Sequence, residues 1–265
     1  MLFAGGLAGR LAASRLASQC AKHLAGIVWD EATGDRPQLP AVPFFHEDGC
    51  QGTADTLFCS GYGGILKEEL LRAFPRGCYN AHPSLLPKYR GRHAIQWAIA
   101  SGERELGVTL HVMFPEIDKG EAVLVRRRYF GVKANLVEIS RALAEMAAEM
   151  LVELCQRLKQ GDFPAPLESA SAEGPYWRRR RPEDGRVSWQ ANVAHIVNLV
   201  RAGKENYPAY AYLPDGTKVS FTGFLASDTP GEVLWASPEG FLIAAADGVV
   251  WVKCDQPLKP GDILR

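Results

Sequence analysis

The sequence predicts an α/β protein in which a mostly parallel, Rossmann-like sheet carries helices on both faces and a small, OB-like C-terminal β-barrel follows. Apolar strand segments alternate with helical segments through residues 1–160, which is the pattern of a parallel sheet with crossover helices. Residues 161–175 are rich in Pro, Ser and Ala and indicate a linker. Residues 176–265 hold short strands separated by turn sequences, which predicts the barrel as a second domain.

The expected elements follow from apolar runs and their spacing. Apolar residues at spacings of three and four predict one long amphipathic helix over residues 134–160. Shorter apolar runs bounded by turn residues predict strands. The expected strands of the first domain are 2–4, 26–29, 42–45, 55–60, 106–114 and 122–130, with a central strand that ends near residue 82, and the other expected helices are 7–23, 67–74, 93–101 and 192–202.

The first 29 residues have two interpretations. They contain no acidic residue and several arginines and serines, a composition that imitates a transit peptide. They also have the pattern of a strand, a Gly5-Gly6 turn and a helix of the fold itself, which is the interpretation we favour. The turn lacks the GxGxxG spacing of a dinucleotide site, so a tight turn explains the two glycines better than an anion site does.

Composition and charge exclude several classes of protein. The 265 residues are 47% hydrophobic and include 30 basic and 30 acidic side chains, so no overall positive field favours a polyanion. The six cysteines form no CxxC pair, and we expect structural thiols in a reducing cytoplasm and no metal. No apolar run reaches the ~20 residues that cross a bilayer, so we expect no membrane association.

The motif around residue 82 is the strongest chemical signal in the chain. Asn80 and His82 are two residues apart at the end of an apolar strand, so both side chains face one side. Pro83 and Pro87 stop the strand and stiffen the loop that follows. A second strand leads to Asp118, 36 residues beyond His82. An amide, an imidazole and a carboxylate that converge in this way predict a site for transferring an acyl group to an amine.

Each of these side chains also has a structural interpretation. Taken singly, His82 fits a core histidine, Asn80 a turn residue and Asp118 a carboxylate at the start of a turn. Their joint occurrence at two strand ends favours the functional interpretation. Ser84 is expected to stabilise the loop and not to act as a nucleophile, because GxSxG is absent. His111 lies inside a strand and is expected to be structural.

These motifs resemble the folate-dependent formyltransferases, which include glycinamide ribonucleotide transformylase, methionyl-tRNA formyltransferase and the sugar-nucleotide N-formyltransferases. The resemblance covers most of the chain and is weakest in residues 30–56, which are shorter than in the relatives. The residues that carry it are Asn80, His82, Ser84-Leu85-Leu86-Pro87, Arg90-Gly91, the Gly107-x-Thr109-x-His111 strand and Asp118-x-Gly120.

The resemblance implies an activity and a set of site residues. It implies transfer of a formyl group from 10-formyltetrahydrofolate to a primary amine through a tetrahedral intermediate, with no metal and no covalent enzyme intermediate. Asn80 and His82 are then expected to stabilise the oxyanion, while Asp118 orients His82 and accepts a proton. The residues that match the folate-binding positions of the family are Gly64, Ile65, Leu66, Phe114 and Ile117.

The start of the second domain has two interpretations that the sequence leaves open. Four consecutive arginines occupy residues 178–181. They fit a solvated linker face, and they equally fit a site that holds an anionic acceptor, because guanidinium groups suit phosphates. Trp177 and Trp189 flank them and fit buried barrel aromatics better than a base-stacking pair.

The acceptor expected from the resemblance is a small amine, an amino sugar linked to a nucleotide. The alternatives are initiator methionyl-tRNA and a formyltransferase-like binding protein with altered catalysis. The short segment 30–56 and the zero net charge argue against the tRNA, and the presence of Asn80, His82 and Asp118 argues against an inert protein. A homo-oligomer is compatible with the sequence.

Overall fold

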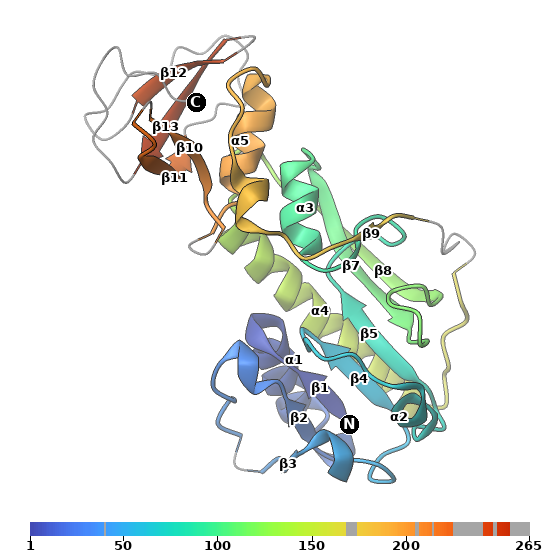
Figure 1. Ribbon diagram of the computed structural model, residues 1–265. Helices are drawn as coiled ribbons and strands as arrows, with labels where there is room; N and C mark the ends of the chain where they lie inside the picture. The colour runs from blue at the N-terminus through green and yellow to red at the C-terminus, as the bar shows by residue number, and fades with distance from the viewer. Residues whose placement is uncertain are drawn as a thin grey trace. The chain divides into compact units, whose positions relative to one another are not determined.

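The computed structural model shows an α/β fold with a seven-stranded sheet (Figure 1). The structure describes residues 1–39, 41–167, 174–204, 207–213, 215–224, 241–245 and 248–254. Clustering of its contacts divides the chain into two compact units. Unit 1 comprises Met1–Gly91, Gly107–Arg128 and Ser140–Tyr176, and unit 2 comprises Arg92–Leu106, Tyr129–Ile139 and Trp177–Arg265.

The seven strands are arranged in the order β3-β2-β1-β4-β5-β7-β8. Their bounds are β1 Leu2–Ala4, β2 Ile27–Trp29, β3 Phe44–Phe45, β4 Leu57–Ser60, β5 Cys78–His82, β7 Glu105–Val112 and β8 Ala122–Tyr129. The pairs from β3 to β5 are all parallel, whereas β5 and β7 are antiparallel. The predicted mostly parallel sheet is therefore confirmed. The first strand and helix are elements of the fold, as we expected.

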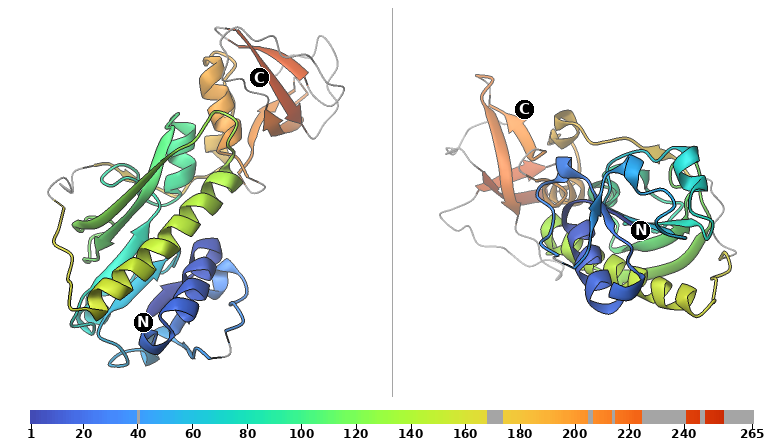
Figure 2. Two further views of the ribbon diagram at one scale, coloured as in Figure 1. Left: turned by 180° about the vertical axis from the view of Figure 1, so that it is seen from behind. Right: turned by 90° about the horizontal axis from the view of Figure 1, so that it is seen from below.

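Helices cover both faces of this sheet because successive side chains on its strands point to opposite faces. On one face, Phe3 and Leu57 belong to the same apolar cluster as Leu70 of α2 (Glu68–Arg72). On the other face, Phe58 shares a cavity lining with Leu16 of α1 (Gly6–Gln19) and with α4 (Leu136–Lys159). The left view in Figure 2 shows α1 and α4 in front of the sheet. The core therefore fills both sides of β1 and β4.

Unit 2 joins a helix from the first half of the sequence to the C-terminal elements. It holds α3 (Ala94–Ala100) and α5 (Val193–Arg201), which pack on each other. Its antiparallel sheet has the order β10-β11-β13-β12, with β10 Ala209–Tyr212, β11 Lys218–Phe224, β12 Phe241–Ala245 and β13 Gly248–Cys254. Residues 225–240 and 255–265 of the predicted barrel lie outside the described residues.

The remaining elements are short. Two strands that the sequence did not predict, β6 Arg90–Gly91 and β9 Tyr176–Trp177, form a two-stranded sheet. The shortened segment 30–56 holds β3 and two single 3-10 turns, Glu31–Thr33 and Glu47–Gly49. Among the helices that the structure describes, none combines the length and the apolar composition needed to cross a membrane.

Candidate active site

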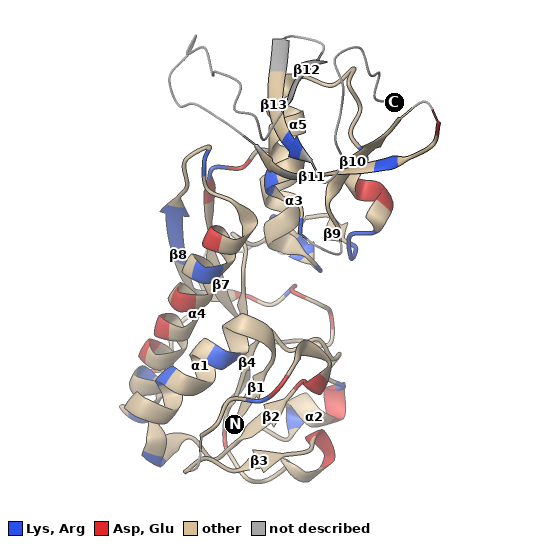
Figure 3. Cartoon of the chain, turned by 90° about the vertical axis from the view of Figure 1, so that its left-hand side faces the viewer, with Lys and Arg blue, Asp and Glu red and all other residues tan. Residues whose placement is uncertain are grey.

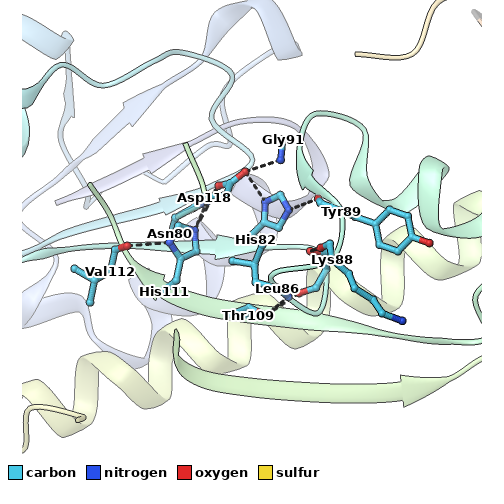
Figure 4. Close-up of polar contacts among 11 residues, drawn as sticks. Asn80, His82, Leu86, Lys88, Tyr89, Gly91, Thr109, His111, Val112 and Asp118 are labelled. Atoms are coloured by element: carbon cyan, nitrogen blue, oxygen red, sulfur yellow. Dashed lines mark hydrogen bonds and ion pairs between the residues drawn. The ribbon is translucent and has the colours of Figure 1, made fainter. Parts of the chain in front are cut away.

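Asn80 and His82 each contact Asp118, the third side chain predicted to converge with them (Figure 4). Asn80 and His82 come from β5, and Asp118 comes from the loop after β7. The Asn80 Nδ2 atom is 3.4 Å from Asp118 Oδ1, and the His82 Nδ1 atom is 3.5 Å from Asp118 Oδ2. The carboxylate thus contacts both members of the pair on β5.

The direction of the strand that leads to Asp118 differs from the one predicted from the sequence. We expected two strand ends at one edge of the sheet, but β7 runs antiparallel to β5 and its last residue, Val112, lies opposite Tyr79. The loop that follows must therefore return along β5 to bring Asp118 to His82. Asp118 itself has a φ of 53°, a left-handed conformation that turns the backbone sharply. Sheet direction depends on non-local pairing, so residue order alone does not predict it.

His111 is a member of this cluster that the sequence analysis assigned to structure alone. It lies directly opposite Asn80 in the strand register and is only 2% exposed. Its Nε2 atom is 3.2 Å from Asn80 Nδ2 and 3.5 Å from Asp118 Oδ1, while its Nδ1 atom is 2.9 Å from the Val112 carbonyl oxygen. A carbonyl only accepts, so Nδ1 carries a proton, and the Nε2 atom faces both the Asn80 amide and the Asp118 carboxylate.

Asp118 is a buried carboxylate that is held in its charged form. Its side chain is 9% exposed, and burial by itself raises the pKa of a carboxyl group. The positive charge available on His82, the hydrogen bond with His111 and the backbone N–H of Gly91, which donates to Oδ2 at 2.9 Å, together lower the pKa of Asp118 to about 2. The group is therefore ionised at neutral pH.

His82 is a buried imidazole whose two nitrogens both face acceptors. Its Nδ1 atom faces Asp118, and its Nε2 atom is 3.0 Å from the carbonyl oxygen of Tyr89. Burial lowers the pKa of His82 below 6.5, although Asp118 and the Tyr89 carbonyl favour the charged ring, so the ring is neutral at pH 7. A neutral ring satisfies one of these acceptors and an imidazolium satisfies both. The surroundings of His82 are thus built to receive a proton.

The Thr109 hydroxyl group fastens the loop after β5 to β7. Thr109 Oγ1 donates to the Ser84 carbonyl at 2.8 Å and accepts from the Leu86 N–H at 3.1 Å. Ser84 Oγ donates to the Lys88 carbonyl at 2.7 Å, which confirms that this hydroxyl stabilises the loop. The Leu86–Pro87 peptide is cis. These bonds hold the Tyr89 carbonyl in place beside His82.

Backbone strain marks the same region. Among the residues that the structure describes, the non-glycine residues with positive φ are Tyr89, His93 and Asp118. Such conformations persist only where the surrounding structure imposes them, and they gather at functional sites. Tyr89 and Asp118 supply the two acceptors of His82. The strain therefore coincides with the groups that position the imidazole.

The residues that match folate-binding positions differ in whether their side chains are exposed. The side chains of Ile65, Phe114 and Ile117 are 65%, 48% and 39% exposed, whereas Leu66 is 6% exposed and belongs to the core of unit 1. Large exposed apolar side chains offer contact surface for a ligand. Leu66 offers only its main chain to a ligand, because its side chain packs inward. Gly64 has no side chain and also offers only its main chain.

The glycines after β4 have a packing role that the sequence analysis did not foresee. A Cβ atom on Gly61 lies 2.4 Å from the Gly5 carbonyl oxygen, and one on Gly63 lies 2.8 Å from Asp30 Oδ2. Gly63 N–H also donates to Asp30 at 2.9 Å. Close approach of the turns after β1, β2 and β4 therefore explains these glycines without a ligand.

Two family models match the chain. The model described as formyl transferase matches residues 44–155, and the model of the formyl transferase C-terminal domain matches residues 180–260. The first match contains Asn80, His82, His111 and Asp118, and the second contains α5 and the strands of unit 2.

Three solved structures with the same fold are between 14% and 22% identical to the chain. HypX from Aquifex aeolicus, crystallised with tetrahydrofolic acid, is 22% identical with a TM-score of 0.66; the match covers 95% of this chain and 43% of HypX, so this chain spans less than half of that protein. An N-formyltransferase from Helicobacter canadensis, with folinic acid and dTDP-3-aminofucose, is 14% identical with a TM-score of 0.70, over 95% of this chain and 97% of that one. Rv3404c from Mycobacterium tuberculosis, a proposed sugar N-formyltransferase, is 17% identical with a TM-score of 0.69, over 86% of this chain and 98% of that one.

Proposed function

The chain belongs to the formyltransferase family, and from this premise we propose that it transfers a formyl group from 10-formyltetrahydrofolate to the primary amine of a nucleotide-linked amino sugar. The observation that carries the proposal is the ionised Asp118 held within 3.5 Å of both Asn80 and His82. Such a set combines an amide donor, a proton acceptor and a fixed negative charge, which are the groups that acyl transfer to an amine requires.

The chemistry divides among the three side chains. The amine nitrogen attacks the formyl carbon, a C–N bond forms, and the carbonyl electrons move to an oxyanion. Asn80 Nδ2 turns from Asp118 to that oxygen, and loss of such a donor costs about 3 kcal/mol of transition-state stabilisation. The ammonium proton passes to His82, whose imidazolium then lies between the Asp118 carboxylate and the Tyr89 carbonyl. The oxyanion electrons re-form the carbonyl, and the bond to N10 of the folate breaks as that nitrogen takes the proton from His82.

Asp118 works in this scheme mainly through its charge. A carboxylate with a pKa of about 2 is a weak base at neutral pH. It stabilises the imidazolium of His82 and fixes the ring, and the Gly91 N–H and His111 keep it ionised. The proton acceptor is therefore His82, and Asp118 raises its ability to hold the proton.

The donor and the acceptor are supported by relatives with the same fold. HypX has been crystallised with tetrahydrofolic acid, and the Helicobacter canadensis enzyme with folinic acid and dTDP-3-aminofucose. In this chain, Ile65, Phe114 and Ile117 offer exposed apolar surface for the folate, and the main chain of Gly64 and Leu66 offers its polar groups.

The test is a turnover assay that follows release of tetrahydrofolate from 10-formyltetrahydrofolate with a panel of amines. We expect turnover with a dTDP- or UDP-linked amino sugar. Turnover with methionyl-tRNA alone contradicts the acceptor and leaves the formyl transfer. The absence of turnover with every amine, together with the absence of folate binding, contradicts the whole proposal.

A further inference from the structure

A cluster of aromatic and cationic side chains lies within unit 2, and we call it the His93 cluster. The Trp97 and Trp177 rings are 5.0 Å apart, and the His93 and Tyr207 rings are 5.6 Å apart. The guanidinium carbons of Arg178 and Arg180 each lie 5.5 Å from the Trp97 ring, and Lys204 Nζ lies 5.6 Å from the Tyr207 ring. The cluster is defined by His93, Trp97, Trp177, Arg178, Arg179, Arg180, Lys204 and Tyr207.

The cluster concentrates positive charge around one neutral imidazole. Burial, followed by the charges of Lys204, Arg179, Arg180 and Arg92, lowers the pKa of His93 to about 4. His93 Nδ1 accepts from the Arg180 N–H at 3.3 Å, so the proton of the neutral ring is on Nε2. Four cations that act together on one ring create a local field that attracts an anion. Basic residues follow β9 in Figure 3.

Arg180 is a buried cation within this field. It is 2% exposed, and its guanidinium donates to two carbonyl oxygens, those of Ala202 at 3.1 Å and Asp184 at 3.0 Å. Its Nε atom is buried and makes no hydrogen bond to the residues that the structure describes. The Asp184 carboxylate is bound by both Nη atoms of Arg178, at 2.6 and 2.7 Å. A buried guanidinium without its own carboxylate partner is costly unless an anion balances it. The interpretation of residues 178–181 as a solvated face is therefore wrong for Arg180.

The backbone of His93 supplies an independent observation. His93 has a φ of 57°, and a bulky side chain adopts that conformation only where the fold imposes it. The residue follows Gly91 by two positions, and the Gly91 N–H is a hydrogen-bond donor to Asp118. The backbone conformation therefore fixes the position of His93 at the start of α3.

We propose that the His93 cluster binds the diphosphate of a nucleoside diphosphate. Lys204 and Arg179 are exposed and supply charge-assisted donors to the phosphate oxygens, and the aromatic rings border the site. Its part in catalysis rests on the proposed function, whereas the binding itself does not. A diphosphate suits the cluster better than a polyanion, because the cations surround a single ring and do not follow an extended groove.

Isothermal titration calorimetry of the full chain with TDP, UDP and inorganic pyrophosphate tests the site. We expect Lys204→Met and Arg179→Gln each to weaken binding roughly tenfold, since each removes a charged donor. Lys218→Met is the matched control, because Lys218 is also an exposed lysine of unit 2 on a tyrosine ring, 4.1 Å from Tyr210. The control should change the affinity less than about twofold, and circular dichroism verifies that all three variants are folded.

The outcomes separate this inference from the proposed function. Diphosphate binding that depends on Lys204 and Arg179 supports the site even where no amine is formylated. Folded variants that bind diphosphate as the wild type does overturn it, and so does a wild type that binds none. Binding of methionyl-tRNA with a steep salt dependence but no binding of diphosphates also overturns it, in favour of a polyanion surface.

Discussion

Two histidines, one in each unit, have a lowered pKa in opposite electrostatic surroundings. Burial lowers the pKa of His82, but the Asp118 carboxylate opposes this shift. Burial also lowers the pKa of His93, and four cations add to the shift. A proton that reaches His82 is therefore stabilised by a neighbour, whereas a proton on His93 is repelled. The comparison shows that the charges around a buried imidazole decide whether it can hold a proton.

Removing the charge of Asp118 breaks the first half of this comparison and has the largest expected effect. We expect Asp118→Asn to lower kcat by about a thousandfold, because the imidazolium of His82 loses its counter-charge. The amide still accepts from the Gly91 N–H, so the loop keeps its position. Stopped-flow or steady-state release of tetrahydrofolate measures the loss.

The control for this variant is Asp215→Asn, an exchange of the same kind in an exposed turn where the side chain accepts from the Thr217 N–H. The control should retain full activity. Folate affinity should change less than about threefold in Asp118→Asn, because the role is in the transition state. A kcat near that of the wild type contradicts the assignment of Asp118.

His82→Ala removes the proton acceptor and is expected to have the second largest effect on kcat. We expect a loss of roughly a hundredfold in kcat, the usual contribution of a general base, while Asn80 and Asp118 remain. His195→Ala is the control, since His195 is exposed on the first turn of α5. A pH profile of kcat that keeps its shape in His82→Ala shows that His82 is not the acceptor.

The sequence predicted local features of these sites and missed the features that depend on distant pairing. Asn80 and His82 share a face because alternation along a strand is local. His111 was assigned to structure because it stands alone within an apolar strand; only the register, which places it opposite Asn80, shows its contact with the cluster. The burial of Arg180 was missed for the same reason, since His93, Trp97 and Ala202 contact it from elsewhere in the sequence.

The pH dependence of stability tests the second half of the comparison. The pKa of His93 falls from 6.5 to about 4 on folding, so between these values the unfolded chain binds a proton that the folded chain does not. The free energy of unfolding is therefore highest, as far as His93 is concerned, above pH 6.5, and it decreases as the pH falls toward 4. Urea unfolding at pH 7.5 and pH 5 should show a smaller loss of stability in His93→Gln than in the wild type.

Diphosphate binding sharpens this test because an anion offsets the four cations. We expect the pKa of His93, followed by NMR of its ring protons, to rise when UDP is added. The His82 signal should not respond to UDP in this way. An equal response of both rings contradicts the separation of their roles.

The smallest effect concerns the loop that connects the two sites along the chain. Ser84→Ala removes the hydrogen bond from Oγ to the Lys88 carbonyl, and a bond of this kind contributes about 1 kcal/mol to stability. Ser84 is 4% exposed, so water replaces this hydrogen bond poorly. We expect the free energy of unfolding to fall by about 1 kcal/mol and kcat to fall only a few-fold, because the Thr109 hydroxyl still fastens Leu86 to β7.

Ser18→Ala, at an exposed position of α1, is the control for stability. A loss of activity in Ser84→Ala as large as that in His82→Ala indicates that this hydroxyl takes part in the reaction, and the division of labour among Asn80, His82 and Asp118 must then be revised.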